Sequence, residues 1–104
     1  MAGGARPARR APERPPSASD EEQVKEAQAR RQQCIGANIR QARKAAGLSQ
    51  RRLAARAGVS DGYLSDVELG RPAVSSDFLV RVAYFLGVSV ESLFSYTILT
   101  STEN

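Results

Sequence analysis

The residues best placed to do chemistry are a serine, a glutamine and two arginines in a row, Ser49-Gln50-Arg51-Arg52. Ser49 and Gln50 stand where a helix is predicted to begin, and the free amides and positive dipole of a helix start bind anions. Arg51 and Arg52 can reach a phosphate there, whereas Arg56 is expected to be solvated. The pattern predicts a phosphate-binding site; the alternative is that Gln50 is an ordinary surface residue.

Catalytic residue types are scarce. The chain has no histidine for general acid–base work, no Cys and His cluster for a metal, and no glycine-rich phosphate loop. Cys34 is the single cysteine, which excludes an internal disulfide and favours a reducing compartment. We expect Cys34 to be a small buried or half-buried residue; a redox sensor would lack a resolving cysteine. The sequence therefore predicts no enzyme, no cofactor, no metal site and no small-molecule ligand.

The charge balance favours a polyanion as partner. Fifteen Lys and Arg against eleven Asp and Glu give a net charge of +4 and a pI near 9.8, which suits nucleic acid without proving it. No apolar run reaches the roughly 18 residues of a membrane span. The N-terminal arginines are not followed by an apolar stretch, as a secretory signal requires. We expect one small cytoplasmic domain.

The anion site must be held by the segment around it, Gln50–Leu69. Its first half places Leu53, Ala54 and Ala57 on one helical face, and its second half does the same with Leu64 and Val67. Between the halves a glycine can end one helix with positive φ, and a serine two residues later can cap the next. Two short helices joined in this way are a helix-turn-helix, whose second helix can enter a DNA major groove.

The same glycine–apolar–serine pattern divides the rest of the chain. It recurs at Gly47–Ser49, Gly58–Ser60 and Gly87–Ser89, and Gly70 with Ser75-Ser76 adds a further break. The breaks predict an all-α, five-helix bundle with helices at Cys34–Ala46, Gln50–Ala57, Asp61–Leu69, Ser76–Leu86 and Val90–Phe94. The expected inward-facing residues of the first, fourth and fifth helices are Ile35, Ile39, Ala42, Ala46, Phe78, Leu79, Val82, Ala83, Leu86, Leu93 and Phe94.

Two N-terminal segments precede the bundle. Residues 1–19 hold four of the five prolines and four arginines against one glutamate, and they are expected to be disordered. They are either a basic arm that contacts phosphates or a minor groove, or a solvated tail. Residues 20–33 are rich in helix formers, with a capping box predicted from Ser19 and Glu22. This helical extension either binds a partner or is simply exposed, and it can run directly into the first bundle helix.

The C-terminal segment, residues 95–104, changes character. Tyr96 to Thr100 are β-branched or aromatic, which favours a short strand. A single strand has no partner in a helical bundle. It either pairs with its copy in a second subunit or frays.

These features together resemble a known family, the phage-repressor or xenobiotic-response-element type of helix-turn-helix DNA-binding domain. The resemblance covers about residues 35–94. It is carried by GLSQ (Gly47–Gln50), LA (Leu53–Ala54), AGVS (Ala57–Ser60), YLS (Tyr63–Ser65), Glu68 with Gly70, and LGVSVESLF (Leu86–Phe94).

The resemblance assigns roles to particular residues. Ser49 and Gln50 correspond to residues that grip a phosphate, and Arg71 lies in a loop that binds the DNA backbone. Arg43 and Glu68 correspond to a pair that locks the reading helix and holds the arginine near phosphate. The residues that the third helix presents to the groove are Ser60, Asp61, Gly62, Tyr63, Ser65 and Asp66.

The sequence departs from the family at the reading helix. Asp61, Gly62 and Asp66 occupy the main base-reading positions, where relatives commonly carry Gln, Arg, Lys or Asn. A carboxylate can accept from cytosine N4, but it also repels phosphates and is costly to desolvate. These acids therefore either read bases or form a solvated face. Val74 stands where relatives often have proline before the serine that caps the fourth helix.

The sequence thus predicts a sequence-specific DNA-binding regulator. It is expected to be a homodimeric repressor on a palindromic operator, because one helix cannot supply the specificity that two half-sites can. The alternative is a protein-interaction adaptor or antitoxin-type module in which the bundle docks a protein partner. The acidic reading helix favours the adaptor, and the Gln50 and arginine set opposes it.

Overall fold

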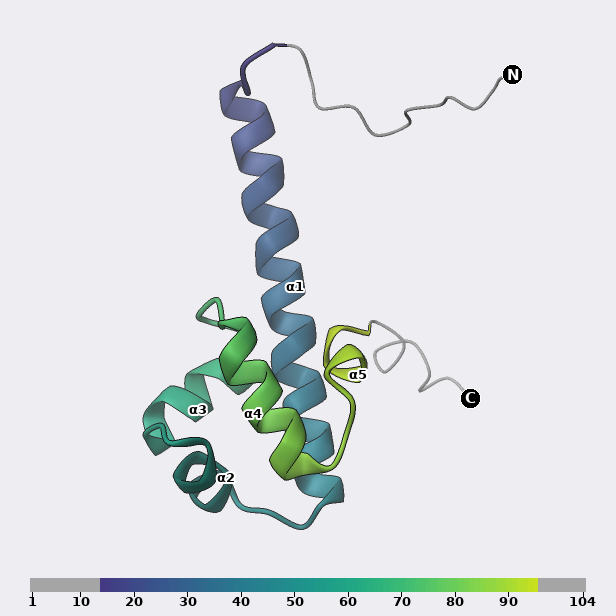
Figure 1. The fold of residues 1–104 in the computed structure, drawn as a ribbon. Coiled ribbons are helices and arrows are strands. Elements are labelled where there is room, and N and C mark those ends of the chain that lie inside the picture. The colour runs from purple at the N-terminus through teal and green to yellow at the C-terminus, as the bar shows by residue number, and fades with distance from the viewer. Residues whose placement is uncertain (1–13, 96–104) are drawn as a thin grey trace, which may run out of the picture.

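The structure, a computed structural model, describes residues 14–95, and this part of the chain contains five α-helices and no strand. They are α1 (Ala18–Ala45), α2 (Gln50–Ala57), α3 (Asp61–Glu68), α4 (Ser76–Leu86) and α5 (Val90–Phe94). Helices α2 to α5 pack around the C-terminal half of α1, while its N-terminal half projects from the bundle (Figure 1). The predicted five-helix architecture is confirmed. Predictions for residues 1–13 and 96–104, the arm and the C-terminal strand, lie outside the described residues.

Helix α1 unites two predicted elements, because the extension and the first bundle helix form one uninterrupted helix of 28 residues. Its start was predicted wrongly. Ser17 is the N-cap, and it forms a capping box with Asp20. Two overlapping Ser-x-x-acid patterns compete here, and the earlier one gains an ion pair between Arg14 and Asp20 at 2.8 Å. Ala18 and Ser19 therefore belong to the helix and not to the arm.

Serine caps define the starts of the remaining helices. Ser49, Ser60, Ser75 and Ser89 each accept a hydrogen bond from the backbone amide three residues later. Helices α2 and α4 end at glycines with φ of 77° and 72°, in the left-handed region that other residues rarely adopt. This is why α2 and α4 begin and end, and α5 begins, where the sequence predicted.

The core lies between α1 and the other four helices. It is built from aliphatic side chains such as Ile39, Leu53, Leu64 and Val82, each with at most 1% of its surface exposed. The predicted inward-facing residues are buried or half-buried, except Ala46. Ala46 is exposed because it is the C-cap of α1, beyond the helix's last inward-facing turn.

Buried polar groups on α1 hold the end of α5. The side-chain amide of Asn38 donates to the carbonyl oxygens of Leu93 (2.9 Å) and Ser95 (2.8 Å), and the thiol of Cys34 donates to that of Ser95 (3.1 Å). These bonds satisfy carbonyls that a helix end leaves without helical partners. Cys34 is 1% exposed, as predicted, and burial raises the pKa of its thiol.

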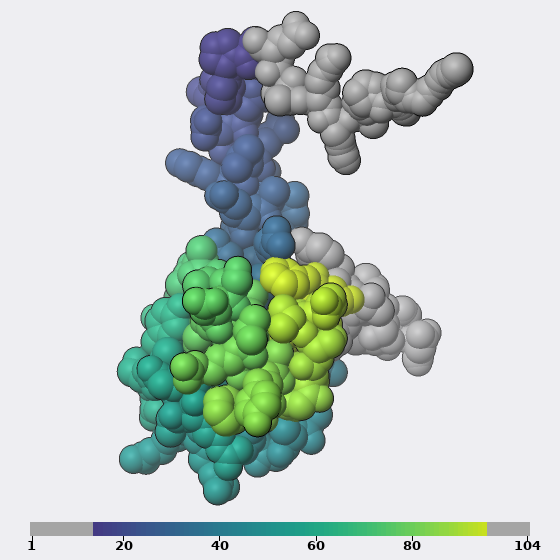
Figure 2. Space-filling model, in the orientation of Figure 1, coloured from purple at the N-terminus to yellow at the C-terminus, as the bar shows by residue number. Residues whose placement is uncertain are grey.

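None of the helices in the described part of the chain is long and apolar enough to cross a membrane. Figure 2 shows the projecting half of α1 clear of the bundle, with α4 and α5 covering the near face. Residues 21–31 are all exposed.

Candidate nucleic-acid interface

Helices α2 and α3 form a helix-turn-helix of two eight-residue helices. The turn between them is closed by the amide of Val59, which donates to the carbonyl of Ala54 at 3.0 Å. The apolar faces of both helices enter the core, so their polar faces remain outside. The turn therefore fixes the beginning of α3 next to α2 at the surface.

The start of α2 retains the features of an anion site. The Ser49 hydroxyl accepts from the amide of Arg52 at 3.1 Å, while the amides of Gln50 and Arg51 belong to the first turn, where a helix supplies no partner. The side chains of Arg51 and Arg52 are exposed. Chemically, this end of α2 can donate to a phosphate oxygen and supply two cations beside it.

The six predicted reading residues on α3 fall into two groups. Asp61 and Gly62 are exposed, and a side chain added at Gly62 would meet no atom within 4 Å. Ser60 is the N-cap, and its hydroxyl accepts from the amide of Tyr63 at 3.0 Å. Tyr63 is half-buried, and its ring packs edge-on against that of Phe78, with the ring centroids 5.6 Å apart. The open positions are therefore those at the first turn of α3.

The remaining residues of this group lie further along α3. Ser65 and Asp66 are half-buried. Asp66 accepts from Arg71 at 3.0 Å in an ion pair whose side chains are 50% and 68% exposed, respectively. The pair offsets the negative charge of Asp66 on the face of α3. Exposed pairs contribute only about 0–1 kcal/mol, so a phosphate can compete for Arg71.

A buried network fixes α3 from behind. The guanidinium of Arg43 on α1 binds both carboxylate oxygens of Glu68, with Nε to Oε2 at 2.7 Å and Nη2 to Oε1 at 3.0 Å. Arg43 also donates to the carbonyl of Leu48 at 2.9 Å. The two charged side chains are 10% and 2% exposed. The pair implied by the family resemblance is therefore present and almost fully shielded from water.

Gln50 joins this network, which the sequence did not predict. Its side-chain nitrogen donates to Oε1 of Glu68 at 2.9 Å. The same residue thus begins α2 and connects α2 to the end of α3. No local pattern could have revealed this bond, because its partner is 18 residues away and on another helix.

Two glycines set the distance between α1 and the reading helix: Gly36, which was not singled out from the sequence, and Gly70, which was treated there only as a helix break and a family marker. A side chain at Gly36 would collide with the carbonyl oxygens of Val67 and Glu68, and one at Gly70 would collide with the backbone of Gln33. Gly36 lies in the middle of α1, where glycine disfavours a helix. That local conflict was the available signal of a close backbone contact.

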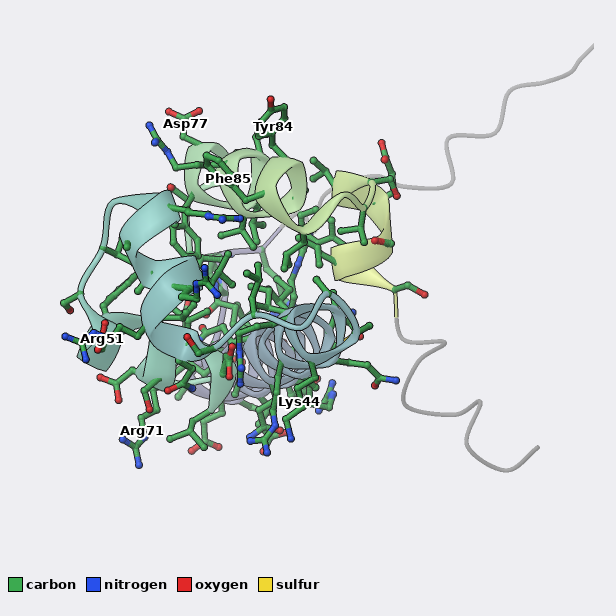
Figure 3. The ribbon with its side chains drawn as sticks, turned by 90° about the horizontal axis from the view of Figure 1, so that it is seen from below. Lys44, Arg51, Arg71, Asp77, Tyr84 and Phe85 are labelled. Carbon is green, nitrogen blue, oxygen red and sulfur yellow. The ribbon has the colours of Figure 1, made fainter. Side chains whose placement is uncertain are left out.

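Metal binding finds no support among residues 14–95, where no group of three or more His, Cys, Asp or Glu side chains comes together. The charged groups with exposed surface on the helix-turn-helix and the loop after it are Arg51, Arg52 and Arg56 on α2, Asp61 and Asp66 on α3, and Arg71. Figure 3 shows Arg51, Arg71 and Lys44 around one side of the bundle, opposite Asp77 and Tyr84. This arrangement suits a polyanion with a groove that can admit α3.

Comparison with known proteins agrees with this geometry. The sequence model of a helix-turn-helix family matches residues 39–93, more than half of the chain. An uncharacterized HTH-type transcriptional regulator of Mycobacterium tuberculosis is 48% identical over 59 residues, which cover 57% of this chain and 42% of the relative. The chain therefore spans less than half the length of that relative.

Solved structures give the same result for the fold. The clp gene regulator ClgR from Corynebacterium glutamicum is 42% identical, with 60% of this chain and 80% of that chain covered and a TM-score of 0.58. The restriction-modification controller protein C.AhdI from Aeromonas hydrophila is 32% identical, with 64% and 96% covered and a TM-score of 0.60. The chain therefore belongs to the phage-repressor, or xenobiotic-response-element, type of helix-turn-helix family, a family of DNA-binding transcriptional regulators.

Proposed function

We propose that this protein is a transcriptional repressor that binds a palindromic operator as a homodimer, with α3 in the major groove. The observation that carries the proposal is the buried Arg43–Glu68 pair, which fixes α3 while its first turn stays open to a ligand. A fixed reading helix beside an anion-binding helix start can engage bases and phosphates together. The protein would act in the cytoplasm, at the nucleoid.

Base reading falls to the open first turn of α3. Asp61 accepts from cytosine N4, and Gly62 lets a thymine methyl group or the DNA backbone come close, because it carries no side chain. Ser60, Tyr63 and Ser65 support this turn and contact the edges of the groove. With few direct base contacts available, DNA shape carries a larger share of the specificity.

Phosphate binding falls to the start of α2 and to the loop after α3. Ser49, Gln50 and Arg51 hold one phosphate through backbone amides, the cation of Arg51 and the second N–H of the Gln50 side chain, whose first N–H donates to Glu68. Arg71 holds another, and it exchanges Asp66 for the phosphate when DNA arrives. Asp66 then faces the groove as an acceptor without a local cation.

A dimer supplies the specificity that one short helix lacks. Two half-sites one helical turn apart, about 34 Å, let two copies of α3 read one face of the duplex. The relatives named as a clp gene regulator and a restriction-modification controller support a role in controlling transcription. A segment that we expect to contribute to dimerisation, residues 95–104, lies almost wholly outside the described residues.

The proposal is tested by selecting bound sequences from a random DNA pool. A palindromic consensus is the expected result, and no enrichment would contradict DNA reading and favour the adaptor. A second test uses Arg71→Ala, which should weaken binding to all sequences by a similar factor and flatten the salt dependence. A changed consensus with an unaltered salt slope would count against phosphate binding by Arg71.

One specific observation favours the adaptor as a second candidate. Helix α3 contains three acids and no base, namely Asp61, Asp66 and Glu68. Glu68 is neutralised by Arg43 and Asp66 by Arg71, so Asp61 remains as the acid of α3 without an ion pair in the described part of the chain. The net negative charge of α3 is therefore smaller than its composition suggests, and it argues less strongly against DNA binding.

A further inference from the structure

The bundle half of α1 carries two exposed cations outside the helix-turn-helix, Arg40 and Lys44, which we call the α1 strip. Residues three and four apart are neighbours on a helix surface, so the strip shares its face with Ala37 and Gln41. Together with Ala45 these residues line a shallow hollow. The strip is thus two long cationic side chains on a face otherwise made of alanines and one neutral amide.

No carboxylate neutralises the α1 strip in the described part of the chain. The ion pairs between residues 14 and 95 join Arg14 to Asp20, Arg43 to Glu68 and Arg71 to Asp66. The sequence has no Asp or Glu between Glu26 and Asp61. The same interval holds eight cations: Arg30, Arg31, Arg40, Arg43, Lys44, Arg51, Arg52 and Arg56. The strip therefore presents uncompensated positive charge.

The α1 strip lies on the same side of the molecule as the loop after α3 that contains Arg71. Figure 3 shows Lys44 and Arg71 on one side of the bundle and Tyr84 on the other. The loop rests on α1, because the side-chain amide of Gln32 donates to the carbonyl of Arg71 at 3.1 Å. Arg40 follows Gln32 by about two helical turns. One side of the protein thus combines the loop cation with the strip.

We propose that Arg40 and Lys44 bind the DNA phosphate backbone and extend the interface beyond the helix-turn-helix. This rests on the proposed DNA binding. The two residues are one helical turn, about 6 Å, apart along the axis, so their long side chains can reach separate phosphates. The contact also compensates for the acids of α3, because it adds attraction where the reading helix offers little.

A purely structural role for the same residues makes a different prediction. Lys44 lies in the last turn of α1, where a cation stabilises the helix dipole, and this effect requires no DNA; Arg40 lies one turn earlier. Replacing them would then lower thermal stability and leave the salt dependence of DNA binding unchanged. Binding to phosphates instead means that the slope of log K against log salt changes by about 0.9 for each phosphate that the variant no longer binds.

The test compares R40Q/K44Q with the control K25Q/R81Q in the full chain. Both variants lower the net charge equally, but Lys25 lies on the projecting half of α1 and Arg81 on α4 beside Tyr84. Binding to a random-sequence duplex is titrated at several salt concentrations. We expect the slope of R40Q/K44Q to be shallower by about 1.8, because two phosphates would go unbound. The control should keep nearly the wild-type slope, and R40K/K44R should restore it.

The outcomes separate this inference from the proposed function. If wild type binds DNA and the two glutamine variants give the same slope, the strip does not bind phosphate and the helix-turn-helix interface stands. If wild type binds no DNA at any salt concentration, both proposals fail. Circular dichroism of each variant shows whether the fold is retained, and R40K/K44R distinguishes removal of charge from altered packing of α1.

Discussion

The buried ion pair between Arg43 and Glu68 allows the sharpest test of how α3 is held. We consider Arg43→Met, Glu68→Leu and the double variant, which replace each charge with an apolar side chain of similar length. Removing one partner leaves the other charge almost fully buried, since the side chains are 10% and 2% exposed. Such unpaired charges cost roughly 3–5 kcal/mol.

The double variant should cost much less than the two single changes together. It leaves no buried charge, but the carbonyl of Leu48 and the side-chain amide of Gln50 each lose a hydrogen bond. Each such loss costs about 1 kcal/mol, so we expect a total near 2 kcal/mol. The single variants should each lower the melting temperature by roughly 12–40 °C, at about 4–8 °C for each of the roughly 3–5 kcal/mol in a domain of this size.

Urea unfolding followed by circular dichroism measures the four free energies of unfolding. The exposed pair of Arg71 and Asp66 serves as a control within the same molecule, because its coupling should not exceed about 1 kcal/mol. Simple additivity of Arg43→Met and Glu68→Leu would refute the reasoning, since it would mean that the charges do not interact. A DNA titration of the double variant then reports what Arg43 contributes to binding beyond stability.

Three further predictions concern the glycines, the cap of α1 and the buried thiol. Gly36→Ala should destabilise the fold and weaken DNA binding, because the added methyl group would collide with the carbonyl of Val67. Gly62→Ala should instead stabilise α3 by about 0.5–1 kcal/mol, because its site is open. Urea unfolding compares the two variants, and equal effects would contradict the close packing of Gly36 against α3. Hydrogen bonds with Ser17 and Arg14 lower the pKa of Asp20, so the capping contribution is present above the unfolded pKa and is lost as pH falls through the folded pKa. Amides in the first turn of α1 should lose protection from hydrogen exchange over that range, relative to the intrinsic exchange rate at each pH, and Asp20→Asn should remove this pH dependence. Burial raises the pKa of Cys34, so folding favours the protonated thiol, and stability falls as pH rises from the unfolded pKa through the folded pKa. Mass spectrometry should find the thiol unalkylated by iodoacetamide until urea unfolds the chain. Rapid alkylation of the native protein would contradict the burial of Cys34.

Local rules predicted most of the helix boundaries. Gly58 and Gly87 end helices and Ser60 and Ser89 begin them, because a left-handed glycine and a capping hydroxyl act within three or four residues of their own position. The start of α1 was missed for the same kind of reason. Two capping boxes overlap in sequence, and the structure forms the one at Ser17, whose Asp20 also pairs with Arg14.

The parts of the site that depend on other helices could not be predicted locally. Asp61 and Gly62 were expected at the surface of the third helix, and they are exposed there. Gln50 was expected to face a phosphate, but its bond to Glu68 depends on how α2 and α3 pack. Asp66 was expected either to read bases or to belong to a solvated face, and its ion pair with Arg71 depends on the path of the loop after α3.

Because α1 is one uninterrupted helix, its projecting N-terminal half has a fixed direction relative to α3. Its axis is tied to α3 at Gly36 and at the Arg43–Glu68 pair, so docking α3 in a groove also sets the direction in which the N-terminal half of α1 extends. The stretch from Ala18 to Arg31 is about 20 Å long at 1.5 Å per residue. Two copies on a palindrome would hold these rods in directions related by the two-fold axis. Spin labels placed near their tips would then report the half-site spacing of the operator as a distance, with no label touching the DNA.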